Sequence, residues 1–339
     1  MKPDRNFVAY LGWFSGTALV LLLAAVGLSI YFKPLSGDLT RIGKWAERDF
    51  GPTLMQESPV IRPNAAALTH QQILVLGDSF SHPNIWQSYL FESSMLETLS
   101  FEFKDVGCID NWLNWVSAQA ASNVQTVVIE VAERSFVPVF KNERRCVVST
   151  PVTSAKSGKA ASTNLMSGIT LDVTYLLQTA GNVLRMRWQT GRINSGEAVN
   201  VPLSNASLFS NVRANRLLYY TEDDSKISWT KQDIADAVGN LQKIQGRLGN
   251  IHLVVAIVPD KSTIYRPFML EAARQAEYPD IFSFIAEAGL SSVDLRSLFQ
   301  KNVERTTDLY LPNDTHLSAS GYRLMAAAIA QRLKSAGGK

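Results

Sequence analysis

The chain has 339 residues, of which 46% are hydrophobic and 19% charged, and its formal net charge is +3. This length accommodates one large domain or two ordinary ones. The composition is typical of a globular protein with a membrane-inserted part. The charge imbalance is too small to predict nucleic-acid binding, and the sequence shows no run of like charges. We therefore expect no nucleic-acid partner.

A long apolar segment, residues 7–32, lies near the N-terminus, and the interval between Arg5 and Lys33 contains no charged residue. It exceeds the roughly 20 apolar residues that span a bilayer. Lys2 and Arg5 precede it, which favours a cytoplasmic N-terminus. A cleaved signal peptide is the alternative, but no convincing Ala-x-Ala site ends the segment. We expect residues 1–35 to be a cytoplasmic tip and an uncleaved transmembrane anchor.

The rest of the chain is then outside the cytoplasm. Residues 36–70 contain three prolines and mixed charge, so we expect a linker there. The main domain is predicted over residues 71–339. Its first strand is the unbroken apolar run Ile73–Leu76, which is typical of a strand buried on both faces of a parallel sheet.

Strands and helices alternate after this first strand. Such alternation predicts an α/β fold, a doubly wound parallel sheet flanked by helices. Further strands are expected at 100–106, 126–131, 253–258 and 292–295, and helices at 84–99, 111–121, 230–248, 267–276, 281–288 and 320–335.

Residues 141–228 interrupt this alternation. The stretches 149–162 and 194–215 are polar and lack periodicity, and a helix is expected only over 171–186. We therefore expect an inserted subregion. Its aromatic residues can pack in a core or stack on sugar rings, and both alternatives stay open. They are Trp188, Tyr219 and Tyr220, with Trp229 just beyond.

Two motifs can bear chemistry. Gly77-Asp78-Ser79 directly follows the first strand and places Ser79 at the carboxyl edge of the sheet, where open α/β folds bind ligands. Far along the chain, Asp314 and His316 precede the last helix. A serine hydroxyl needs a base such as an imidazole, and the imidazole needs an acceptor that orients it. Alternatively, these residues form an ordinary βα turn and a loop histidine.

In order and position, these motifs resemble the SGNH/GDSL hydrolase superfamily. That superfamily usually has Asp three residues before His, whereas Asn313 stands there in this chain. The Asp314-Thr315-His316 form is instead similar to the alginate O-acetyltransferase proteins of the same superfamily. The segments 127–136 and 258–265 also resemble parts of those proteins, although the order of the motifs is permuted.

The resemblance implies an acyl-enzyme mechanism, with Ser79 as nucleophile, His316 as base and then acid, and Asp314 as its orienting partner. It also implies an oxyanion hole, for which Gly107 is a candidate by position. Asn111 and Arg134 are further candidates for the oxyanion or substrate site, and Arg134 can equally be an ion-pair residue. No cofactor and no metal are implied. Lys261 is expected to be solvated.

The chain contains two cysteines, Cys108 and Cys146. An oxidising compartment permits a disulfide between them. Two unrelated buried thiols are the alternative, because the sequence does not give the distance between the cysteines.

By this resemblance, the protein is an O-acetyltransferase on a cell-surface or secreted polysaccharide, in the bacterial inner membrane with its catalytic domain in the periplasm. The expected partners are the polysaccharide acceptor and an acetyl donor supplied through a membrane-bound O-acyltransferase. An acetyl esterase of the same fold and a non-catalytic polysaccharide-binding or scaffold subunit are the alternatives. The polymer, the donor and the oligomeric state do not follow from the sequence.

Overall fold

The structure is a computed structural model, and it describes residues 5–32, 36–55, 57–61, 73–119, 124–141, 173–270 and 277–337. A five-stranded, all-parallel sheet lies at the centre of the main domain, with the strand order β2-β1-β3-β7-β8. Its strands are β1 (Ile73–Gly77), β2 (Thr98–Glu102), β3 (Thr126–Ala132), β7 (His252–Val258) and β8 (Ser292–Val293). The predicted parallel sheet is thus confirmed.

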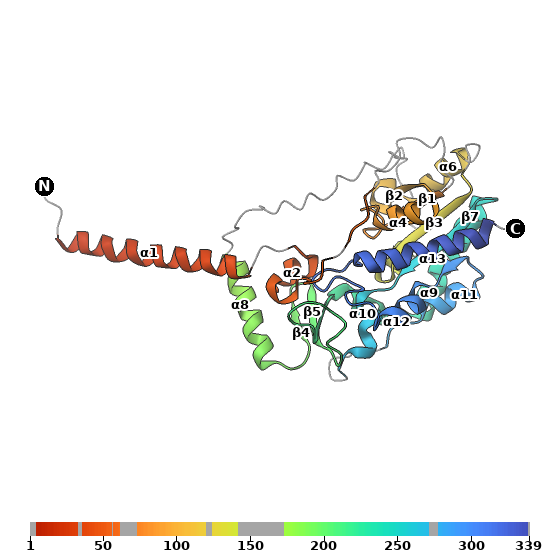
Figure 1. Ribbon diagram of the computed structural model, residues 1–339. Helices are drawn as coiled ribbons and strands as arrows, with labels where there is room; N and C mark the ends of the chain where they lie inside the picture. The colour runs from red at the N-terminus through yellow and green to blue at the C-terminus, as the bar shows by residue number, and fades with distance from the viewer. Residues whose placement is uncertain are drawn as a thin grey trace.

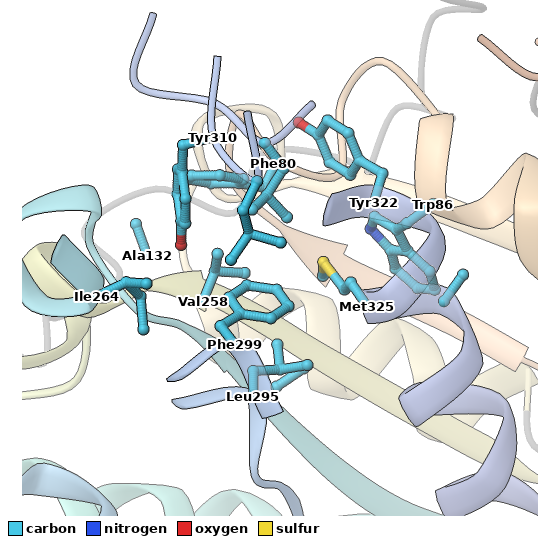
Figure 2. Close-up of a cluster of buried hydrophobic side chains, with 14 of the residues drawn as sticks. Phe80, Trp86, Ala132, Val258, Ile264, Leu295, Phe299, Tyr310, Tyr322 and Met325 are labelled. Carbon is cyan, nitrogen blue, oxygen red and sulfur yellow. The ribbon is translucent and has the colours of Figure 1, made fainter. Parts of the chain in front are cut away.

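Helices cover both faces of this sheet (Figure 1). On one face, α4 (Ile85–Ser94), α12 (Leu295–Asn302) and α13 (Ala319–Gly337) bury a core that includes Trp86, Phe299 and Met325 (Figure 2). On the other face lie α6 (Ile109–Gln119), α7 (Phe136–Phe140), α9 (Lys231–Leu248) and α11 (Ile281–Glu287). Strand residues alternate between the two cores, which explains why β1 and β7 consist almost entirely of apolar residues.

A second sheet lies within the predicted insertion. It is antiparallel and consists of β4 (Ile193–Ser195), β5 (Ala198–Pro202) and β6 (Arg216–Tyr220). The helix α8 (Val173–Trp188) precedes it, and the 3-10 segment η4 (Thr221–Ser228) follows it. Val199, Val201 and Leu217 belong to the same core as β1 and α13, so this sheet packs directly on the main domain.

Several predicted bounds were wrong. The second strand ends at Glu102, level with Gly77 of β1, and residues 103–106 form the helix α5 (Phe103–Val106) instead. Because β1, which is the strand that pairs with β2, ends at the same level, the residues after Glu102 have no described strand beside them to pair with. Of the predicted helix at 267–276, residues 267 and 268 belong to the 3-10 segment η5 (Arg266–Phe268), which follows α10 (Lys261–Tyr265). Residues 271–276 lie outside the described ranges, so the rest of this prediction is untested.

The expected linker is folded over its first part. Residues 36–50 contain α2 (Asp38–Gly43) and α3 (Glu47–Phe50). Leu39, Trp45 and Phe50 are fully buried in a cluster with Ile193 and Leu218 of the small sheet. Burial of these apolar side chains holds residues 36–50 against the domain. The mixed charge of the segment gave no indication of this burial in the sequence. The limits predicted for the domains otherwise stay predictions.

The N-terminal helix α1 (Arg5–Phe32) projects from the rest of the molecule (Figure 1). Residues Arg5–Leu28 are long and apolar enough to cross a membrane, and none of that stretch is buried. A membrane span and a signal sequence both have these properties.

Candidate functional site

The serine of the first motif lies in a turn beyond β1. Gly77 ends the strand, and an added Cβ there would lie 2.5 Å from Ser81 Oγ and 2.7 Å from Glu130 Oε2, so only glycine fits. Asp78 stabilises the turn, since its carboxylate accepts from the N–H of Phe80 at 3.0 Å and of Ala132 at 2.7 Å. The next helix begins only at Ile85, so Ser79 is exposed in the turn and not in a first helical turn.

The structure brings Ser79, His316 and Asp314 together. His316 Nε2 lies 3.0 Å from Ser79 Oγ, and His316 Nδ1 lies 2.7 Å from Asp314 Oδ1. The same Asp314 oxygen also accepts from the backbone N–H of His316 at 3.0 Å. This order of hydroxyl, imidazole and carboxylate is the arrangement that activates a serine.

The imidazole ring also packs against an aromatic side chain. Phe80 is buried, and its ring centroid lies 5.0 Å from that of His316. Figure 2 shows Phe80 beside Tyr310 and Tyr322 at the top of the core. The ring that directly follows the serine therefore limits the orientations that His316 can take.

Neighbouring charges change the pKa of His316. Burial alone would lower the pKa of His316, but the hydrogen bond and charge of Asp314, with the charge of Asp38, outweigh burial and raise this pKa above its usual value. Burial likewise opposes ionisation of Asp314, yet its bonds to His316 hold the pKa of that carboxyl well below its usual range. A raised pKa makes His316 a stronger base for the serine proton.

Asp38, in the expected linker, is a site residue that the sequence did not reveal. Its backbone N–H donates to Asp314 Oδ2 at 3.2 Å, and its own carboxylate lies 3.9 Å from His316 Nδ1. Asn313 explains why this segment approaches, because its carbonyl accepts from Leu39 N–H at 3.0 Å and its amide binds the buried Glu47. Asn313 is thus a docking residue here.

Within the described ranges, Asp38, Asp314 and His316 also form a group of the metal-ligand type, with one donor atom from each within 4.8 Å of the others. Both nitrogens of His316 are engaged, however, one with Asp314 and the other with Ser79. The arrangement therefore fits proton transfer better than it fits a cation site.

Lys261 is only 2% exposed and binds the loop that carries Asp314 and His316, which we call the histidine loop. Its ammonium donates to the carbonyls of Leu311, Pro312 and Asp314 at 2.7, 3.0 and 3.1 Å. Burial lowers the pKa of Lys261 to about 7, although Asp314 and two other carboxylates oppose this shift. The expectation of a solvated lysine was wrong, because this amine replaces water as the donor to a buried loop.

Arg134 follows β3 and lies in a buried ionic network. It donates to Asp260 at 2.8 Å and Asp223 at 3.5 Å, and Lys226 bridges Asp260 and Glu133. Burial opposes its charge, but these carboxylates outweigh burial and raise its pKa. The ion-pair role is therefore present. Its charge also acts on Asp78 and lowers the pKa of His316, while a role at the oxyanion stays a prediction.

Gly107 and Asn111 are the remaining candidates for the oxyanion site. Gly107 follows α5 and lines a cavity of about 430 Å³ with Phe140, Asn240 and Arg247, a lining that includes neither Ser79 nor His316. Asn111 lies in the first turn of α6. Gly107 is separated from the end of β2 at Glu102 by the short helix α5. Their oxyanion roles stay predictions.

Cys108 is disulfide-bonded. Cys146 lies outside the described residues, so the pairing of the two cysteines stays a prediction.

Similarity to known proteins supports the resemblance drawn from the motifs. Residues 214–339 match the family model described as SGNH hydrolase-like domain, acetyltransferase AlgX. This matched part contains Lys261, Asp314 and His316. A solved crystal structure aligns with 80% of this chain and 99% of its own at 14% identity, but its TM-score of 0.34 is too low to support an argument. Among curated proteins, none matches the chain.

Proposed function

We propose that this protein transfers acetyl groups to the hydroxyls of a polysaccharide outside the cytoplasm, since residues 214–339 match the family model of an SGNH hydrolase-like domain, acetyltransferase AlgX. The observation that supports the proposal is the hydrogen-bonded chain from Ser79 through His316 to Asp314. An apolar α1 as inner-membrane anchor would hold the domain on the periplasmic side.

The mechanism has two halves. In the first, Ser79 Oγ attacks the carbonyl carbon of the acetyl donor while His316 Nε2 takes the serine proton. The donor's leaving group departs with that proton, and acetyl-Ser79 remains. In the second, a sugar hydroxyl attacks acetyl-Ser79 while His316 takes its proton, which then returns to Ser79 Oγ as the ester bond to the enzyme breaks. Asp314 keeps Nδ1 protonated and stabilises the imidazolium in both halves.

Transfer requires that the sugar hydroxyl, and not water, reach the acyl-enzyme. Ser79 is exposed, which gives water access as well and favours the esterase as the second candidate. The two activities share the acyl-enzyme and differ in its acceptor. In this proposal, the acetyl donor is provided through a membrane-bound O-acyltransferase.

Ser79→Ala tests the catalytic role. In an assay with a chromogenic acetyl ester and an acetyl-free oligosaccharide, we expect wild-type protein to give acetylated sugar and an acetylated Ser79 peptide by mass spectrometry. The variant should lose at least about a thousandfold in rate, because the nucleophile is gone. Ser335→Ala, at the exposed end of α13, is the matched control and should stay active.

The same assay separates the alternatives. Ester release that the oligosaccharide does not intercept would favour an esterase. Full activity in Ser79→Ala would exclude the serine mechanism, and an inactive wild type that still binds the oligosaccharide would favour a scaffold subunit.

A further inference from the structure

The helix α8 carries apolar side chains on its solvent side. Leu177, Leu184 and Trp188 are 68%, 56% and 84% exposed. Their spacing of seven and four residues places them on one side of the helix, and we call this set of three residues the outer stripe. Exposed apolar residues that occur singly are ordinary, but a line of them on one helix face marks a contact surface.

The opposite side of α8 packs against the rest of the molecule. Leu176 and Thr179 are buried, and Asn182 donates to the carbonyls of Gly43 at 3.1 Å and Lys44 at 2.9 Å. These contacts attach α8 to α2, the helix whose first residue, Asp38, reaches Asp314. These contacts fix the orientation of α8, so that the outer stripe faces solvent.

The position of α8 suggests what covers the stripe. It contacts α1 and runs across the end of that helix, not along it (Figure 1). The end of α1 is also held by Arg48, whose guanidinium lies 4.0 Å from the centroid of the Tyr31 ring. If α1 crosses a bilayer, a helix lying across its end runs along the membrane surface.

The charges of α8 fit an anionic surface. The helix contains Arg185 and Arg187 and no acidic residue. At 100° per residue these two exposed arginines flank the outer stripe on either side. An apolar stripe ending in tryptophan and bordered by arginines is typical of helices that lie in the headgroup region of a bilayer. Lys44, the residue directly after the adjoining α2, adds further positive charge, whereas Arg41 within α2 is paired with Asp38.

We propose that α8 is an interfacial helix whose outer stripe inserts into the headgroup region of the anionic bilayer that holds α1. The inference rests on the membrane anchorage in the proposed function. It adds that the domain lies against the membrane in one fixed orientation and does not swing freely on its anchor.

Fluorescence quenching in full-length protein tests this contact. The protein is reconstituted in phosphatidylcholine vesicles with and without phosphatidylglycerol, with the lipids brominated near the glycerol end of their acyl chains. We expect brominated lipid to quench Trp188, so that Trp188→Phe removes a distinct share of the quenching. Trp229→Phe, a tryptophan packed beside α9, is the matched control and should leave the quenching unchanged.

The charge contribution has its own expected result. Arg185→Gln with Arg187→Gln should reduce the quenching of Trp188 at least twofold in vesicles that contain phosphatidylglycerol, and much less in pure phosphatidylcholine. Equal quenching of wild type and double variant in both kinds of vesicle would refute the electrostatic part.

The remaining outcomes separate this inference from the proposed function. Trp13 lies within α1, so loss of quenching in Trp13→Phe reports the anchor by itself. Quenched Trp13 with unquenched Trp188 would overturn the interfacial helix and leave the anchor standing. Protection of Trp188 from acrylamide by an oligosaccharide, without lipid quenching, would also overturn it and identify a sugar-stacking surface. Ser79→Ala should quench like wild type, whatever its activity.

Discussion

At the scale of residues, the site depends on a carboxylate from outside the two motifs. His316 already has Asp314 at 2.7 Å, yet Asp38 lies 3.9 Å from the same nitrogen. A second negative charge stabilises the imidazolium further, at a distance where the interaction is mainly electrostatic. Asp38 thereby adjusts the basicity of His316 without contacting the serine.

Asp38→Asn should lower the pKa of His316, because it removes one of the charges that raise this pKa. The base works in its neutral form, so activity falls as the pH drops through the pKa of His316. We expect the acid limb of the kcat/KM profile for ester hydrolysis to move to lower pH in the variant. At the optimum, the change should stay below about threefold, since Asp314 keeps the ring oriented.

Asp236→Asn is the matched control, because Asp236 is exposed on α9, and its profile should coincide with that of wild type. An acid limb of Asp38→Asn that stays in place, or moves to higher pH, would contradict the assigned role.

At the scale of elements, α2 and α3 work as a clamp on the loop of Asp314 and His316. Gly37 is the point of closest approach, because an added Cβ would lie 2.2 Å from the carbonyl oxygen of Asn313. Leu39 N–H donates to that same oxygen at 3.0 Å. The loop is thus held on one side by this segment and on the other by the ammonium of Lys261.

Gly37→Ala should therefore displace α2 and remove the hydrogen bond from Asp38 N–H to Asp314. We expect kcat/KM for ester hydrolysis to fall at least tenfold, since misplacement by about 1 Å is enough for a loss of this size. The melting temperature should fall only modestly, because the main sheet keeps its packing.

Gly239→Ala supplies the comparison. Gly239 lies within α9, where an added Cβ meets nothing within 4 Å, so alanine should be neutral or stabilise the helix by up to about 1 kcal/mol. Equal activity of the two variants would show that the contact at Gly37 has no influence on the site.

At the scale of the whole molecule, the segment after α1 belongs to the folded domain. It contacts the small antiparallel sheet through Trp45 and Phe50, and it contacts the loop of Asp314 and His316 through Asp38. The membrane-proximal residues, the inserted sheet and the candidate site are therefore one packed unit, in which α8 is attached to α2.

Truncation tests this unity. A protein beginning at residue 36 should remain folded and hydrolyse a soluble acetyl ester at a rate within about threefold of the full chain. A protein beginning at residue 52 should lose most of its activity, because three large buried side chains, Leu39, Trp45 and Phe50, leave their pockets empty. Circular dichroism and ester kinetics measure both effects. An active, stable protein from residue 52 onward would show that the segment is only a tether.

What the sequence by itself determined is local in origin. Apolar runs without polar alternation sufficed to predict β1, β3 and β7, because strands buried on both faces have apolar residues at nearly every position, the buried Glu130 of β3 being an exception. Ser79, Asp314 and His316 were identifiable because each motif places its chemistry within a few residues.

Only the tertiary structure decided which other residues join them. Asp38 and Lys261 contact the histidine loop from positions 276 and 53 residues away from Asp314 in the chain. Contacts between distant segments depend on how the whole chain packs, and no short stretch of sequence determines that packing.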